Sequence, residues 1–171
     1  MAFITGEVRL DFVRLAKPDD KGSYSVCVLI DKDDADTIAL INEAVETCAE
    51  ENKGIWGGKI PKNLARPLHD GDVNRDTDEY PQFEGQMYLN ANTFRPPYLA
   101  DADDEPLADP KQLYSGVYVR IALEPSAYYH ADTGKKGVKL YVNAVQKTRD
   151  GERIGPDTTS GGSVSFGKFK M

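Results

Sequence analysis

The residue pattern that decides the fold is Val117-Tyr118-Val119-Arg120-Ile121-Ala122-Leu123, followed further along the chain by Val138-Lys139-Leu140-Tyr141-Val142-Asn143-Ala144-Val145. Large apolar residues recur at every second position in both stretches. Because successive side chains of a β-strand point to opposite faces, this spacing predicts two strands, each with one buried face. Ser126–Tyr129 extends the first strand beyond a break at Pro125, and Thr133–Gly137 is a hairpin turn. The two strands are therefore expected to pair.

Three more strands are expected on the N-terminal side of this hairpin. Thr5–Leu15 alternates cleanly, and Ser23–Ile30 is rich in β-branched and aromatic residues. Met87–Phe94 again alternates, with its apolar residues on one face. The turn Pro18–Gly22 joins the first two of these strands, which predicts a second hairpin.

One long helix is expected directly after the second strand. Asp33 and Asp34 offer an N-cap, and the helix is expected to run to about Asn52. Its apolar face is formed by residues at helical spacing: Ile38, Ile41, Val45 and Cys48. The stretch from Ile55 to Gln86 that follows is irregular, and loops of this length in a compact domain are often functional.

Together these elements predict a mainly β protein, built as a five-stranded OB-type barrel with one long α-helix after strand 2 and long loop insertions. Periodicity alone would fit another small β-barrel with one helix equally well. A single domain over residues 1–155 is expected, because the chain has 171 residues and contains no repeat or linker. The glycine-, serine- and threonine-rich residues 156–171 are expected to form a flexible tail.

Composition excludes a membrane protein and a disulfide-stabilised one. No apolar run approaches the ~18 residues that cross a bilayer. The first residues carry no basic region and no apolar core, so no signal peptide is expected. Cys27 falls in an expected strand and Cys48 on the apolar face of the helix, which favours two buried, reduced thiols in a cytoplasmic protein.

The net charge of -7 argues against a nucleic-acid partner until its distribution is considered. Asp31–Glu51 holds eight acidic residues and one basic residue, and Asp101–Asp109 holds five acidic residues and no basic one. The rest of the chain therefore carries a net charge of +5. Charges more than about 8 Å apart are largely screened at physiological salt, so local basic patches matter more to a polyanion than the total.

The solvent faces of the last three strands carry aromatic, amide and basic residues in place of the usual small polar ones. Such a face offers rings on which bases stack and cations that meet phosphates. The alternative is that the helix or the long loop covers these rings. Burial is expected for Tyr118 before the others, because Tyr118 lies on a central strand. The candidates on this face and at the end of its first strand are Tyr88, Asn90, Phe94, Arg95, Tyr118, Arg120, Lys139 and Tyr141.

Two further clusters are candidates for nucleic-acid binding. The long loop contributes Trp56, Lys59, Arg66 and Arg75, which could close over a strand; Trp56 could equally anchor the loop to the barrel, and the bases could simply be solvated. The last hairpin contributes Tyr128 and Lys136, because in OB folds the loop between the last two strands flanks the binding face. Ordinary solvated charge is the alternative there.

Catalysis is not expected, and neither are a metal, a cofactor or a small-molecule substrate. Asp70-Gly71-Asp72 has no third carboxylate nearby, so a turn is favoured over a two-metal nuclease site. Asp101, Asp103 and Asp104 lack the spacing of a calcium loop. The histidines and cysteines are too widely separated for a zinc signature, and no phosphate-binding glycine loop or nucleophile elbow is present.

Seven stretches, in this order and spacing, resemble a family of tailed-bacteriophage proteins. They are Tyr24–Ile30, Trp56–Pro61, Pro67–Asp72, Tyr88–Ala91, Leu113–Arg120, Lys136–Val138 and Val145–Glu152. This family was formerly known as a domain of unknown function and has been associated with single-stranded DNA binding. The resemblance covers about Val8 to Gly155. It implies an OB fold and a role in phage replication and recombination in the cytoplasm of the infected bacterial host.

The leading hypothesis is sequence-tolerant binding that protects single-stranded DNA, with phage or host replication proteins as further candidate partners. The C-terminal residues depart from the pattern expected for recruitment of replication proteins. Single-strand binders often end in an acidic tail that recruits partners, whereas this chain ends in the basic, aromatic Ser165–Met171. The alternative hypothesis is a replication-complex adaptor that binds a protein partner through its acidic surfaces.

Overall fold

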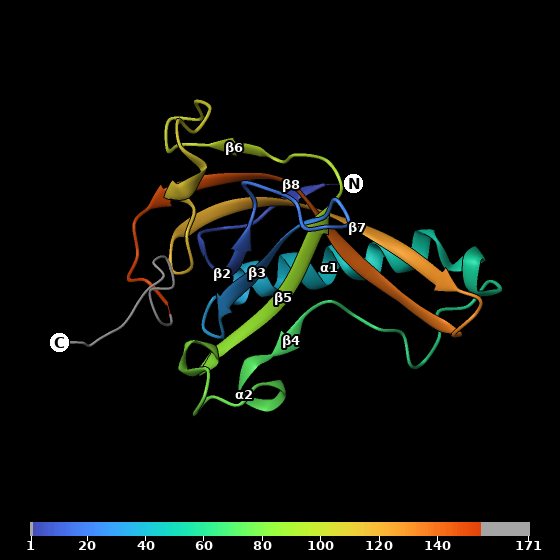
Figure 1. Ribbon diagram of the computed structural model, residues 1–171. Coiled ribbons are helices and arrows are strands. Elements are labelled where there is room, and N and C mark those ends of the chain that lie inside the picture. Colours follow the sequence, from blue (N-terminus) through green and yellow to red (C-terminus); the bar gives the residue numbers. More distant parts are fainter. Residues whose placement is uncertain (1, 155–171) are drawn as a thin grey trace.

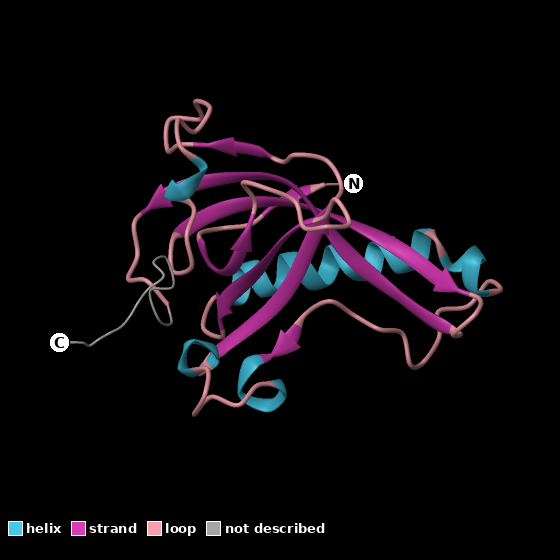
Figure 2. Cartoon of the chain, in the orientation of Figure 1, coloured by secondary structure: helices cyan, strands magenta, loops and turns pink. Residues whose placement is uncertain are grey.

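The structure is a computed structural model that describes residues 2–154, so the expected tail at 156–171 lies outside the described residues. The described chain is mainly β, with one sheet of eight strands and two α-helices (Figures 1 and 2). The strands are β1 Phe3–Ile4, β2 Val8–Arg14, β3 Tyr24–Asp31, β4 His69–Asp70, β5 Gln86–Thr93, β6 Tyr98–Ala100, β7 Tyr118–His130 and β8 Lys135–Arg149. The helices are α1 Ala35–Glu51 and α2 Gly71–Asn74, and short 3-10 turns are η1 Lys53–Trp56, η2 Pro81–Phe83 and η3 Pro110–Gln112.

The five expected strands correspond to β2, β3, β5, β7 and β8, and both expected hairpins pair as antiparallel neighbours. The expected number of five strands is wrong, because β1, β4 and β6 are also present. These strands have two or three residues, too few to show a period of two. The expected break at Pro125 is also wrong, since Pro125 lies in register with Leu140. A proline is tolerated there because β7 has only β8 as a partner beyond Leu123 among the described residues.

The strand pairings form a closed circuit. β2 pairs with β3, β3 with β5, β5 with β8, β8 with β7, and β7 again with β2. The β5–β8 pair is parallel and short, with Ala91 opposite Leu140 and Asn92 opposite Tyr141. The β7–β8 pair is the longest, and its outer part, residues 127–138, projects as an arm beyond the circuit (Figure 1).

The core lies on the inner face of this circuit. Alternate residues of each strand are fully buried there, and burial of this apolar surface is the main stabilising contribution. α1 packs against β7 and β8, using Ile41, Val45 and Ala49. The helix begins after Asp34, whose carboxylate accepts a hydrogen bond from Thr37 N at 3.2 Å, as the sequence predicts. Cys27 and Cys48 are buried free thiols, also as predicted.

Gly116 fixes the start of β7. Its φ is +113°, and its N–H donates to Leu10 O at 2.8 Å, which ties β7 to β2. A Cβ at this position would overlap Glu152 O.

We expect Gly116→Ala to lower the free energy of unfolding by about 2–4 kcal/mol in chemical denaturation, because backbone strain and overlap add.

The matched control is Gly54→Ala, where a Cβ meets nothing within 4 Å. It should change the free energy of unfolding by less than about 1 kcal/mol. Equal effects of the two substitutions would contradict this account of the β2–β7 junction.

Candidate nucleic-acid interface

The strand register places outward side chains of β3, β5, β8 and β7 in two adjacent rows. The first row joins Ser25 to Asn92, Asn92 to Tyr141, and Tyr141 to Glu124. In the second row Cys27 pairs with Asn90, and Lys139 pairs with Ser126. Asn90 and Lys139 belong to the same row because each of them precedes by one residue a member of the Ala91–Leu140 pair. All but Cys27 are partly or fully exposed. We name six of these residues the open strip: Ser25, Asn90, Asn92, Ser126, Lys139 and Tyr141.

The open strip combines a ring, a cation and amides. Lys139 Nζ lies 4.8 Å from the centroid of the Tyr141 ring. Asn92 is the direct neighbour of Tyr141, and Asn90 is the exposed residue beside Lys139. Glu124 lies at the end of the strip, where its carboxylate accepts a hydrogen bond from the Asn143 amide at 3.0 Å. The strip can therefore stack a base, hydrogen-bond its edge and neutralise a phosphate.

The next row on the same outer face is covered. Tyr88, expected on the solvent face, is only 6% exposed, and this expectation is wrong. Phe83 from η2 packs edge-on against Tyr88 with ring centroids 5.1 Å apart. The Arg75 guanidinium lies 5.0 Å from the centroids of both rings. Tyr88 does point outward, but the loop 71–85 closes over it, and Arg75 is held by the two rings.

This loop is anchored at several further points. Lys32 Nζ lies 2.8 Å from an Asp70 oxygen and 2.6 Å from an Asp72 oxygen, and these hydrogen bonds lower the pKa of both carboxyls. Asp70 also caps α2 by accepting from Asp72 N, so the structure has a short helix where the sequence favoured a turn. On the other side, Gln82 donates to the buried Asp11 carboxylate at 2.8 Å. Among the described residues, no cluster of three or more potential metal ligands occurs.

Desolvation is the main cause of the pKa shifts of two groups close to this loop, the buried Cys27 and the exposed His69. The pKa of Cys27 is raised to about 12, mainly by burial and further by the charge of Asp11. The pKa of His69 is lowered by burial and then by the charge of Arg75. Both groups therefore stay neutral at pH 7, and His69 adds no cation to this face.

The β7–β8 arm is braced by the long loop. Trp56 is 8% exposed, and its indole N–H donates to Tyr128 O at 3.0 Å. Ala65 joins the edge of β8, donating to Lys136 O at 3.0 Å and accepting from Val138 N at 2.9 Å. Of the two readings of Trp56, its burial favours the anchor.

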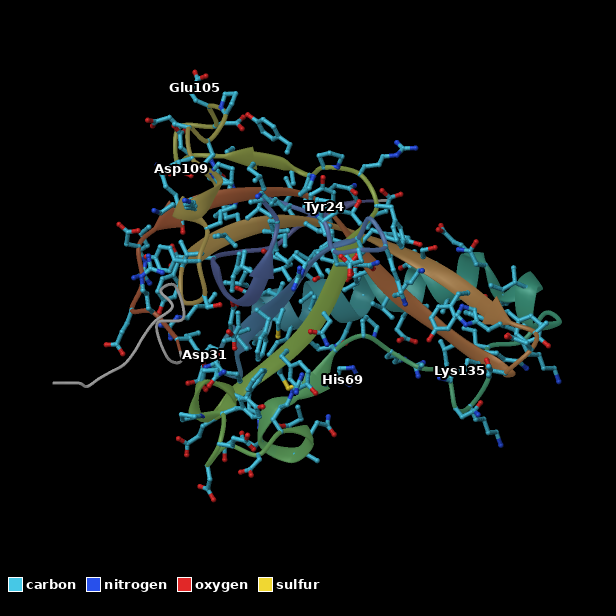
Figure 3. The ribbon with its side chains drawn as sticks, in the orientation of Figure 1. Tyr24, Asp31, His69, Glu105, Asp109 and Lys135 are labelled. Carbon is cyan, nitrogen blue, oxygen red and sulfur yellow. The ribbon has the colours of Figure 1, made fainter. Side chains whose placement is uncertain are left out.

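The arm and its loop hold several accessible cations. Lys59 is exposed, whereas Arg66 is paired with Glu46 through two hydrogen bonds of 2.6 and 2.9 Å. Lys136 Nζ lies 5.5 Å from the ring centroid of the exposed Tyr129. Tyr128 is half-buried, and its ring lies over Gly137. The arm thus presents a second cation and ring pair, formed by Lys136 with Tyr129 (Figure 3 labels the adjacent Lys135).

The remaining candidates are distributed over other parts of the surface. The ring of Tyr118 is contacted by two arginines of its own chain, with Arg149 3.8 Å and Arg9 5.5 Å from its centroid. Arg120 is exposed in a groove beside β6. Phe94 is 61% exposed just after β5, and Arg95 beside it is exposed too. The structure therefore brings Asn90, Lys139 and Tyr141 together but separates them from Tyr118 and Arg120.

Several residues of this surface were not among the expected site residues. Ser25, Asn92 and Ser126 could have been found from strand parity, once the pairing of β5 with β8 was known. Phe12 carries the opposite signal, because the alternation of β2 places it with Val8 and Leu10 on the buried face, and this expectation is wrong. It is exposed with φ of +48° at an irregularity of β2 between Asp11 and Arg14, and its ring stacks on Phe83 with centroids 6.5 Å apart.

Solved structures similar to this chain include single-stranded DNA-binding proteins of two bacteriophages. The single-stranded DNA-binding protein of bacteriophage Enc34 is 24% identical, with a TM-score of 0.75 over 92% of this chain and 88% of that one. Its complex with ssDNA gives the same score and identity over 90% and 89%. Bacteriophage T7 gp2.5, a single-stranded DNA-binding protein, is 15% identical, with a TM-score of 0.68 over 95% of each chain.

Sequence comparison identifies the family. Residues 1–168 match the family described as Enterobacter phage Enc34, ssDNA-binding protein. Protein p50 of Acyrthosiphon pisum secondary endosymbiont phage 1 is 30% identical over 183 residues, which cover 95% of this chain and 92% of that protein. The chain therefore belongs to the Enc34 ssDNA-binding protein family, and the resemblance seen in the seven stretches is confirmed. Within residues 2–154, no helix is both long and apolar enough to cross a membrane.

Arg75 is predicted to hold the covering loop in place. We expect Arg75→Ala to lower the free energy of unfolding by about 1–2 kcal/mol, because two cation–ring contacts are lost. Amide hydrogen exchange should accelerate across residues 71–88. Arg66→Ala is the control, since an exposed ion pair contributes only about 0–1 kcal/mol. If exchange over residues 71–88 is unchanged by Arg75→Ala, the rings and not the cation hold the loop.

Proposed function

We propose that this protein coats single-stranded DNA with little sequence preference, and that the strand crosses the open strip. The observation that carries the proposal is the Lys139–Tyr141 pair, which lies beside the amides of Asn90 and Asn92 on a solvent-exposed part of the sheet. Tyr141 would stack on a base and Lys139 would meet a phosphate. Every base has a π-face, so this mode of binding tolerates any sequence.

The path would extend from the strip toward the arm. Lys136 and Tyr129 repeat the combination of cation and ring there, and Lys59 lies on the loop that braces the arm. Phe94 and Arg95 would continue the path beyond the end of β5. Tyr118, Arg120, Arg66, Arg75, Trp56, Tyr88 and Tyr128 would contribute less, because they are paired, buried or on another part of the surface.

The charge distribution supports this path. The segment 101–109 is acidic, and in Figure 3 its Glu105 and Asp109 lie far from Lys135 at the tip of the arm. Screening at physiological salt limits the reach of those carboxylates to about 8 Å. A polyanion near the arm would therefore encounter Lys135, Lys136 and Lys139, against the single carboxylate of Asp132 in the hairpin turn.

The closed circuit of five strands supports an OB-type barrel, with α1 after the second strand of the circuit and the β7–β8 hairpin beside the binding face. Residues 1–155 would form the DNA-binding domain and 156–171 a separate tail. The protein would act by binding, without a chemical step, during phage replication and recombination in the cytoplasm of the host. Membership of the Enc34 family and the ssDNA complex of the Enc34 protein support this role.

The proposal is tested by fluorescence anisotropy with labelled oligo-dT at several salt concentrations. Tyr141→Ala should weaken binding roughly 5- to 150-fold, because a stacked base contributes about 1–3 kcal/mol. Lys139→Ala should weaken binding and reduce the slope of log affinity against log salt by about 0.7, because one phosphate contact is lost.

Lys111→Ala and Tyr98→Ala are matched controls, since both residues are exposed and lie outside the open strip. They should leave affinity and salt slope unchanged, and all four variants should keep the melting temperature. Affinities that do not differ among the four variants would exclude the open strip. Weak or absent binding of the unaltered protein at low salt would instead favour the adaptor hypothesis.

A further inference from the structure

A groove with no role in the proposed DNA path lies on the outer face of β7 and β8, beside β6. Ile4, Tyr98, Ala122 and Ala144 form its apolar lining, and Ile4 and Tyr98 are exposed. The hydrogen bond from Asn143 to Glu124 separates it from the open strip. Exposed apolar surface in a concave site is typical of a binding surface.

One rim of this groove is strongly acidic. Asp104 lines it, and the segment Asp101–Asp109 contains five acidic residues and no basic one. Gln146 holds this segment against β8 by donating to the Asp101 and Ala102 carbonyls at 3.3 Å. Within residues 2–154, no basic side chain forms an ion pair with these carboxylates. Arg120 also lines the groove, but the five carboxylates of the segment outnumber it, so the groove favours an apolar, cationic occupant.

We propose that the groove binds Phe166–Lys170 of the same chain. This segment reads Phe-Gly-Lys-Phe-Lys, and no acidic residue follows Asp157. Its phenylalanines would occupy the apolar lining, where the Arg120 guanidinium can stack on a ring. Its lysines would pair with Asp103, Asp104 and Glu105 on the rim.

The length of the chain allows this contact. Ile154 N donates to Ser115 O at 3.0 Å, so the described chain ends beside residue 115. The groove residue Arg120 is five residues further along, a distance of at most about 18 Å. The twelve residues from 154 to 166 can span up to about 40 Å, which is more than enough.

The test is paramagnetic relaxation in the full-length chain without DNA. A nitroxide label is attached at Ser165→Cys. Cys27 and Cys48 should stay unlabelled because both are buried, and burial raises the pKa of Cys27 to about 12 and raises that of Cys48 as well. We expect the amide signals of Ala100, Ala122 and Ala144 to lose most of their intensity relative to the reduced label.

The triple substitution Asp103→Lys, Asp104→Lys, Glu105→Lys should restore these signals, and so should Phe166→Ser with Phe169→Ser. The matched control is Asp36→Lys, Glu43→Lys, Glu51→Lys on α1, which makes the same charge change and should not restore them. Equal behaviour of the two charge triples, or losses centred on Lys139 and Tyr141, would overturn the proposal. So would losses in a mixture of isotope-labelled and spin-labelled molecules, which would mean that the segment binds a second copy. None of these outcomes depends on DNA binding, so this proposal and the DNA path can fail separately.

Discussion

The short parallel pairing of β5 with β8 is the constraint on which the rest of the structure depends. It joins residues about fifty positions apart in the sequence and closes the circuit that begins with the β2–β3 hairpin. Side chains alternate along a strand, so this register has two consequences. Ala91 and Leu140 enter the core together, while Asn92 and Tyr141 meet on the outside. A shift of one residue would bury Tyr141 and expose Leu140, so the fold and the open strip share one determinant.

The outer face serves two purposes. Over β2, β3 and the first half of β5, aromatic rings contribute to folding, since Phe83, Tyr88 and Arg75 form a small second core with Cys27 and Leu29. Over the second half of β5 and the facing part of β8, the side chains stay accessible. A stacking ring cannot both be buried by its own loop and receive a base. The covering loop therefore sets the edge of the surface that is open to a polynucleotide.

The sequence predicts much of this fold because strands β2, β3, β5, β7 and β8 have clear period-two patterns, and because Asp34 is a recognisable helix cap. It also predicts the outward orientation of Tyr88 and Tyr141 correctly. It does not show that Tyr88 is buried while Tyr141 stays accessible, because Tyr88 is covered by Phe83 and Arg75 from a loop without periodicity. The sequence also does not show that Arg66 forms an ion pair, because its partner Glu46 is twenty residues away on α1. Arg120 lies apart from Tyr141 because the β7–β8 register pairs Arg120 with Gln146 and Tyr141 with Glu124, and no pattern in the sequence predicts that register.

The central claim is that a single strand lies across the open strip, and amide chemical-shift mapping during titration with oligo-dT tests it most directly. Shifts should concentrate in residues 90–93 of β5, residues 136–141 of β8 and Ser25, while residues 101–109 and the exposed face of α1 stay unchanged. Shifts that avoid β5 and β8 and cluster around Tyr118 and Arg149 would contradict the account and assign the binding surface to the other end of the sheet.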